Sequence, residues 1–91
     1  MSIKKTFKAL SDEYRREILE MLKNGTMTAG EIYSKFDMTQ ATVSHHLSIL
    51  KEADLVRIER KGKYIYYELN STVFDDVMKW IMSFKEENNE K

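Results

Sequence analysis

The 91-residue sequence contains no cysteine, no proline and only three glycines. Without cysteine the chain forms neither disulfide bonds nor thiolate metal sites, so covalent staples do not offset its small size. Linkers rich in proline or glycine are absent as well, and we therefore expect one domain over residues 1–91. A chain this short buries only a modest share of its surface, which makes an oligomer a reasonable expectation.

Long apolar runs are also lacking. Between residues 1 and 19 no more than two apolar residues stand together, so we expect neither a secretory signal nor a membrane span in this stretch. The expectation that follows is a cytoplasmic protein.

An excess of either charge is absent too, since fifteen basic and fifteen acidic residues cancel. Nucleic-acid-binding domains usually carry excess positive charge, so this sum argues against one. The distribution is nevertheless uneven: residues 1–11 carry three lysines and no carboxylate, and "RIERKGK" at 57–63 has four basic residues against Glu59. Charge alone leaves two interpretations of that cluster open, a solvated hairpin tip or a contact with phosphates.

Apolar spacing predicts a helix over residues 3–10 and a second one that begins at an N-cap on Ser11 and ends at Asn24-Gly25. "TAGE" at 28–31 has the spacing of a capping box and predicts a third helix to about Phe36. Thr39 then offers an N-cap for a fourth helix from Gln40 to about Ala53. Two short helices this close together are typical of a helix-turn-helix.

Beyond them, "LVRIE" and "YIYYEL" are rich in β-branched and aromatic residues, with "RKGK" between them as a glycine-containing loop. This pattern predicts a β-hairpin. Asn70 or Ser71 can cap a last helix, for which we expect fraying in the polar end "KEENNEK". The predicted fold class is mainly α with a small β-hairpin, in the order four helices, two strands and a final helix.

Two adjacent histidines stand on the fourth helix. Val43, Leu47 and Leu50 form its core stripe, and His46 lies close to that stripe while His45 lies nearly opposite. Because the two rings diverge by roughly a third of a turn, they cannot grip one ion together as histidines at i and i+4 can. We interpret His46 as a histidine at the edge of the core with a satisfied hydrogen bond.

The outward side of the first turns of the fourth helix carries short or polar residues and no carboxylate. The major groove of DNA admits such a helix, because base edges display donors, acceptors and methyl groups there, and hydroxyls can equally bind phosphates. A basic hairpin tip beside it would lean along the minor groove, although the helix face could instead be merely solvated. The candidate DNA-binding residues are Thr39, Gln40, Thr42, Ser44, His45, Ser48, Lys51, Arg57, Arg60, Lys61 and Lys63.

Four stretches, "FKALSDEYRREILEML", "MTAGEI", "ATVSHHLSILKEADLV" and "RKGKYIYYELN", together span nearly the whole chain. In them the sequence resembles the ArsR-type winged helix-turn-helix transcriptional repressors, most closely the metal-independent autorepressors of the SdpR type. The resemblance implies a dimer that binds double-stranded DNA, with DNA contacts by Ser44 and His45. It also implies a membrane protein that sequesters the repressor as a further partner.

Metal-sensing members of that family use cysteines on the third helix, or histidines and carboxylates on the last. Here the third helix has no cysteine and the last has no histidine, while Asp75 and Asp76 are adjacent rather than on one face. We therefore expect no metal site and no cofactor.

The last helix is apolar over roughly half of its circumference, wider than the stripe of about 100° that one core requires. Together with the first helix it predicts a two-fold dimer centred near Trp80, and the alternative is that all these residues pack within one chain. The candidate dimer residues are Ile3, Phe7, Val73, Val77, Trp80, Ile81 and Phe84, with Phe74, Met78 and Met82 widening the apolar face.

The sequence thus predicts a repressor that occupies a palindromic operator as a dimer, including one at its own promoter. Two alternatives stay open: a protein-interaction module on the same fold, and a repressor of the same family gated by a ligand or a metal ion. We expect no enzyme, because cysteine, a glycine-rich phosphate loop and a catalytic motif are all missing.

Overall fold

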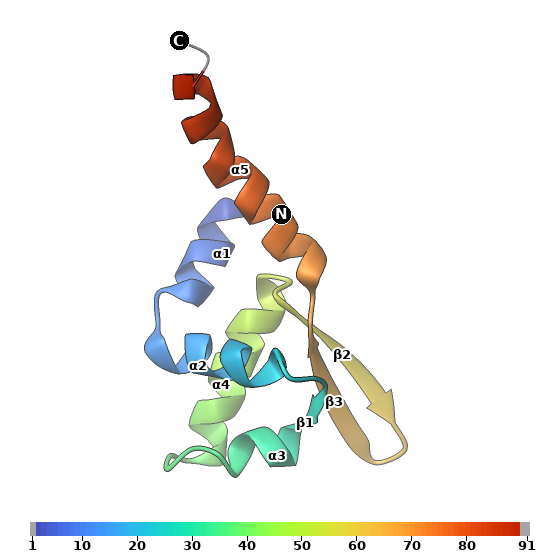
Figure 1. Ribbon diagram of the computed structural model, residues 1–91. Coiled ribbons are helices and arrows are strands. Elements are labelled where there is room, and N and C mark those ends of the chain that lie inside the picture. Colours follow the sequence, from blue (N-terminus) through green and yellow to red (C-terminus); the bar gives the residue numbers. More distant parts are fainter. Residues whose placement is uncertain (1, 90–91) are drawn as a thin grey trace.

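A computed structural model describes the backbone of residues 2–89 and the side chains of residues 2–85 (Figure 1). Its elements follow one another as α1 (Ile3–Leu10), α2 (Glu13–Leu22), β1 (Met27–Thr28), α3 (Ala29–Tyr33), α4 (Gln40–Glu52), β2 (Val56–Lys61), β3 (Tyr64–Leu69) and α5 (Ser71–Asn89). The predicted class is confirmed, a mainly helical chain with a small antiparallel sheet. Strand β1 was not predicted.

Polar caps set where the helices begin. Thr28 and Glu31 form the expected capping box of α3, and Thr39 Oγ1 accepts a hydrogen bond from the Thr42 N–H at the start of α4. The prediction that Ser11 caps α2 is wrong. Asp12 is the cap, since its carboxylate accepts from two backbone N–H groups, whereas the Ser11 hydroxyl donates to the Lys8 carbonyl and closes α1.

Several predicted helix ends also differ. Helix α2 ends at Leu22, and Gly25, with φ of +132°, lies in the turn that follows. Helix α3 ends at Tyr33 rather than Phe36, whose ring instead packs edge-on against Tyr14. Helix α5 extends to Asn89, within the polar end for which we expect fraying, and residues 90–91 lie outside the described part.

The core lies where α2, α3 and α4 meet one face of the sheet. Ile18, Ile32, Leu47, Leu50 and Leu55 are fully buried there. At about 1.5–3 kcal/mol for each buried aliphatic side chain, this cluster is the main source of stability. This core packing holds α4 through one face and leaves the opposite face exposed to solvent.

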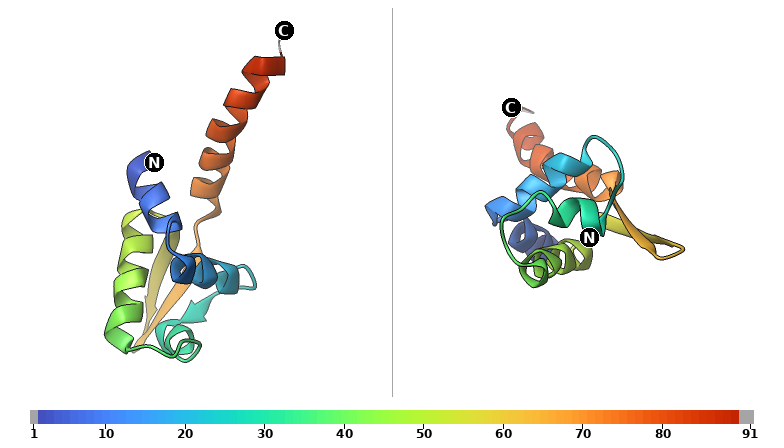
Figure 2. Two further views of the ribbon diagram at one scale, coloured as in Figure 1. Left: turned by 90° about the vertical axis from the view of Figure 1, so that its left-hand side faces the viewer. Right: turned by 90° about the horizontal axis from the view of Figure 1, so that it is seen from below.

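The sheet has the order β1-β3-β2, with all neighbours antiparallel. Strand β1 pairs Met27 with Tyr67, so it attaches the start of α3 to the hairpin. The β2–β3 hairpin projects beyond the helices in Figure 1 and in the right-hand view of Figure 2, and it turns at Gly62, whose φ of +61° favours glycine. A helix-turn-helix with a projecting hairpin is a winged helix.

Helix α5 leaves the body of the molecule and leads away from it in Figure 1 and in the left-hand view of Figure 2. The radius of gyration is 15.1 Å, against about 12 Å for a compact domain of this length. Of the two expected caps, Asn70 immediately precedes α5, and its carbonyl accepts from the Val73 N–H. Its side chain donates from Nδ2 to the Asp54 carbonyl and ties the start of α5 to the turn between α4 and β2.

Candidate nucleic-acid interface

The outward face of α4 is open to solvent. Six side chains along it are exposed, and none of the other elements covers them: Gln40, Ala41, Thr42, Ser44, His45 and Ser48. The opposite face carries Val43, Leu47 and Leu50, all buried. The core stripe predicted from the sequence is thus present, and the candidate DNA-reading residues lie together on the other side.

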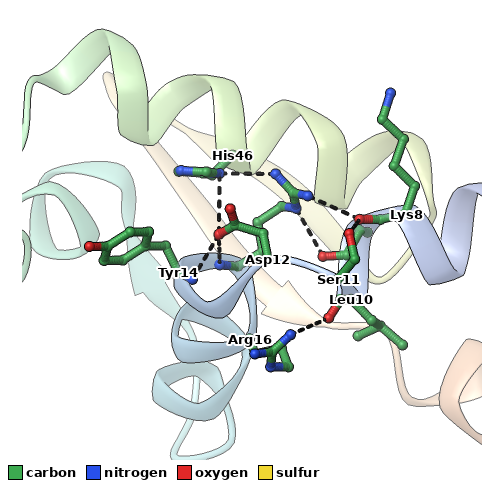
Figure 3. A network of polar contacts seen from close by, with 9 residues as sticks. Lys8, Leu10, Ser11, Asp12, Tyr14, Arg16 and His46 are labelled. Atoms are coloured by element: carbon green, nitrogen blue, oxygen red, sulfur yellow. Dashed lines mark hydrogen bonds and ion pairs between the residues drawn. The ribbon is translucent and has the colours of Figure 1, made fainter.

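A polar network joins α4 to α1 and α2 (Figure 3). Arg15 is only 8% exposed. Its Nε donates to the Ala9 carbonyl at 2.9 Å and its Nη2 to the Lys8 carbonyl at 3.0 Å, while Nη1 lies 3.1 Å from His46 Nδ1. A guanidinium can only donate, so Nδ1 must accept, and His46 is then the neutral tautomer with its proton on Nε2.

Asp12 completes this network at the start of α2. Its Oδ1 lies 2.8 Å from the Tyr14 nitrogen, 3.2 Å from the Arg15 nitrogen and 4.0 Å from His46 Nδ1. Desolvation raises the pKa of the Asp12 carboxyl, but the backbone N–H donors of Arg15 and Tyr14 and the charge of the Arg15 guanidinium outweigh it, so the pKa is lowered from its ordinary value. The sequence-based interpretation of His46 as a bonded histidine at the core edge is confirmed.

Hydroxyl pairs stand at the exposed end of the helix-turn-helix. Thr39 Oγ1 and Thr42 Oγ1 are 2.8 Å apart, so both threonines are partly engaged in capping α4. A second pair, 2.8 Å apart, joins Ser44 Oγ on α4 to Tyr33 Oη on α3. Sequence reasoning named Ser44 but not Tyr33, because nothing local to residue 33 indicates a partner eleven residues away.

The basic residues of the wing point in different directions. Lys61 Nζ lies 5.5 Å from the Tyr66 ring centroid and 3.8 Å from Glu59 Oε1, and Lys63 Nζ lies 5.8 Å from the Tyr64 ring centroid. Arg60 pairs in register with Ile65, on the side of the sheet that faces the core. Within residues 2–85, Arg60 makes no hydrogen bond or ion pair, so its guanidinium is the one wing-tip cation without a competing partner there.

Arg57 lies at the base of the wing, away from its tip. Its Nη2 donates to Asn70 Oδ1 at 3.0 Å, next to the bond from Asn70 to the Asp54 carbonyl. The structure therefore separates Arg57 from the other candidate DNA-binding residues and gives it a role in joining the wing to α5. Lys51 is exposed in the last turn of α4.

The candidate dimer residues fall into two groups. Val73 and Val77 are 6% and 8% exposed and belong to the chain's own core, which corrects their assignment to a dimer surface. Phe7, Trp80 and Phe84 instead form an exposed aromatic row, with ring centroids 6.0 Å and 5.1 Å apart in turn. Other apolar side chains of α5 that remain exposed are Met78, Ile81 and Met82, while Ile3 is half-buried.

Within residues 2–85 no three histidine or carboxylate side chains gather in a group that could hold a metal ion. Over the same part of the chain and the rest of the described backbone, no helix is long and apolar enough to cross a membrane.

Residues 40–48 of α4 present an exposed surface without a carboxylate, called the reading face below. A winged helix-turn-helix with such a face defines a class of DNA-binding protein. Residues 10–59 match the family described as "Helix-turn-helix domain". The chain is 50% identical over 78 residues to the transcriptional repressor SdpR of Bacillus subtilis (strain 168), covering 86% of this chain and 87% of that protein. It is 37% identical over 71 residues to the arsenical resistance operon repressor of Staphylococcus aureus, covering 78% and 68% respectively.

Among solved structures, the crystal structure of an ArsR family transcriptional regulator superposes with a TM-score of 0.89 at 25% identity, covering 98% of this chain and 92% of the other. The chain belongs to the ArsR-type winged helix-turn-helix transcriptional repressors, as the sequence resemblance implied.

Proposed function

We propose that this protein is a dimeric repressor that binds a palindromic operator with the outward face of α4 in the major groove and the wing tip along the adjacent minor groove. The observation that carries the proposal is the exposed face of α4 over residues 40–48, on which small polar side chains stand without a carboxylate, whereas Glu52 lies in the last turn of the helix. Phosphates repel carboxylates, and base edges lie within reach of short hydrogen-bonding groups.

Residue roles follow from where each side chain lies. Gln40, His45 and Ser48 face the base edges, and Gln40 and His45 reach furthest, each with both a donor and an acceptor. The Ser44 hydroxyl is paired with Tyr33 and serves a phosphate contact. Thr39 and Thr42 contact phosphates through their paired hydroxyls, of which that of Thr39 also caps α4. Lys51, Arg60, Lys61 and Lys63 supply charge to the DNA backbone, and Arg60 is the cation best placed to enter the narrow minor groove.

The dimer forms through α1 and α5, with the aromatic row Phe7–Trp80–Phe84 at its centre. This row is continuous across the two helices, and α5 leads away from the rest of its own chain. The same row on a second copy of the chain is apolar too, so the two rows can pack against each other about a two-fold axis. Pairing two chains presents two α4 faces and two wings to one duplex, about 34 Å apart. A chain of zero net charge can thereby bind DNA, because its charge is unevenly distributed: residues 64–91, most of which belong to α5, carry six carboxylates against three lysines.

Fluorescence anisotropy with promoter DNA at several salt concentrations tests the proposal. The logarithm of the association constant is expected to fall linearly and steeply with the logarithm of salt concentration, because bound lysines and arginines displace counterions. A monomer whose weak binding does not respond to salt would contradict the proposal and favour a protein-interaction module instead.

Two finer points belong to the same proposal. The repressor acts in the cytoplasm on its own promoter, and a membrane protein that binds it releases the DNA, by analogy with the family resemblance. Footprinting on DNA immediately upstream of the coding region tests the first point, with protection of an imperfect palindrome as the expected result.

A further inference from the structure

Tyr33 joins the body of the protein to its DNA-facing surface. Its half-buried ring packs against the hydrophobic core, on the side of Tyr67. Burial raises the pKa of the Tyr67 phenol and the neighbouring Tyr33 adds to this, which reflects how near the two phenols lie. The Tyr33 hydroxyl nevertheless reaches the exposed surface, 2.8 Å from Ser44 Oγ on the reading face of α4.

The Tyr33–Ser44 pair of hydroxyls keeps one O–H donor that is not used within the pair. Each hydroxyl carries one donor hydrogen and two acceptor lone pairs. Within the pair one hydroxyl donates to the other, so a single O–H remains to point outward. The oxygens of a DNA phosphodiester only accept hydrogen bonds, and a pair with one free donor is complementary to them.

Tyr33 is the better of the two outward donors. A phenol is more acidic than the alcohol of serine, with a pKa of about 10, and a more acidic O–H makes a stronger hydrogen bond to an anion. Its ring is also held by the core, so little side-chain entropy is lost when the hydroxyl binds. Ser44 then donates to the Tyr33 oxygen and fixes the direction of the phenolic O–H.

The position of α3 decides which part of the DNA it meets. In a helix-turn-helix the second helix enters the major groove while the first crosses the DNA backbone. Tyr33 ends the first of these helices, beside the second. We propose that Tyr33 donates a hydrogen bond to a phosphodiester oxygen of the DNA and that Ser44 positions this donor, an inference that rests on the proposed mode of DNA binding.

The variant Tyr33→Phe removes the hydroxyl and keeps the ring. We expect the affinity for DNA to fall by about 3- to 10-fold, the usual worth of one hydrogen bond, and to fall equally on operator and unrelated duplexes because phosphates carry no sequence information. The slope of log affinity against log salt is expected to stay unchanged, because a neutral donor releases no counterion. The melting temperature should also be unchanged.

Tyr14→Phe is the matched control. The Tyr14 hydroxyl makes no hydrogen bond within the described side chains, so this variant should bind as the wild type does. Ser44→Ala leaves the phenolic donor in place and is expected to lose less than Tyr33→Phe, and the double variant should lose no more than Tyr33→Phe alone.

Methylphosphonate substitution of single phosphates gives a second measurement on the same DNA. Replacement of the one phosphate that Tyr33 contacts is expected to weaken DNA binding by the wild type but not by the Tyr33→Phe variant. Wild-type affinity in Tyr33→Phe with normal salt dependence, or a loss confined to one sequence, overturns the phosphate contact and leaves the proposed function intact. If the wild type itself binds DNA without salt dependence, both proposals fall together.

Discussion

The proposed role of the aromatic row on α1 and α5 in dimerisation leads to a quantitative prediction for the Trp80→Ala variant. Trp80 is 40% exposed in the single chain, which amounts to about 100 Å² of a tryptophan surface of about 250 Å². At about 25 cal/mol per Å², burying that area in a dimer contributes about 2.5 kcal/mol per protomer, or about 5 kcal/mol for the two copies of a two-fold interface. Area converts only partly into affinity, so we expect dimerisation to weaken by at least about 100-fold.

Sedimentation equilibrium over a range of concentrations measures this loss directly. Lys79→Ala, an exposed neighbour on the same helix, is the control and should leave the dimer unchanged. A Trp80→Ala monomer engages half of the phosphates, so the slope of log affinity against log salt should fall to about half of the wild-type value. If Trp80→Ala dimerises within threefold of the wild type, the aromatic row is not the dimer surface.

Three further predictions concern the reading face, the wing and the start of α2. His45→Ala should reduce the preference for operator over unrelated DNA by about tenfold, measured by competition binding, with nonspecific affinity unchanged. Lys63→Ala should weaken binding to all sequences alike and reduce the salt slope by about 0.9, and unequal losses would show that Lys63 reads bases. Because the pKa of Asp12 is lowered from its ordinary 3.8, its contribution to stability is complete above about pH 4 and is lost as the pH falls through the folded value. Urea unfolding of Asp12→Asn, which keeps a capping oxygen, should therefore depend less on pH below pH 4, whereas Asp12→Ala should lose about 1 kcal/mol at pH 7.

The order of the helices and the hairpin could be predicted because each depends on residues close together in the chain. The capping box at Thr28 and the core stripe of α4 are local patterns of this kind. Strand β1 could not be predicted, since Met27 and Thr28 form a strand only by pairing with Tyr67 and Tyr66 far along the chain.

Competition between neighbours accounts for the other differences. Ser11 and Asp12 are both good N-caps, and the structure selects the carboxylate because it accepts two backbone N–H groups. Val73 and Val77 were assigned to the dimer because sequence periodicity shows an apolar face but not which body covers it. In the site itself, the exposed residues of α4 followed from its core stripe, whereas the bonds of Arg57 to Asn70 and of Tyr33 to Ser44 depend on tertiary contacts.

Arg15 connects the predicted dimer surface to the reading face. Helix α1 carries Phe7 of the aromatic row and also the Lys8 and Ala9 carbonyls that the Arg15 guanidinium holds, while the same guanidinium donates to His46 on α4. A rigid connection of this kind fixes the separation of the two α4 helices in a dimer, and therefore the half-site spacing that the protein accepts. Neutral His46 is compatible with this connection, because its Nδ1 can accept the hydrogen bond from the Arg15 guanidinium.

Loss of the Arg15 connection should reduce the selectivity for half-site spacing and leave the preference for particular bases unchanged. For Arg15→Ala we expect stability to fall by about 3 kcal/mol, because three acceptors lose a charged donor, while the ratio of affinities for the native operator and for one lengthened by a single base pair falls toward one. His46→Gln keeps an acceptor for the guanidinium and should retain the wild-type ratio, whereas His46→Leu should lose it. Binding is measured well below the melting temperature of each variant, so that only folded protein is compared. If Arg15→Ala and His46→Leu still reject the lengthened operator as strongly as the wild type, the spacing is set by α5 alone and the Arg15 network serves only the stability of each chain.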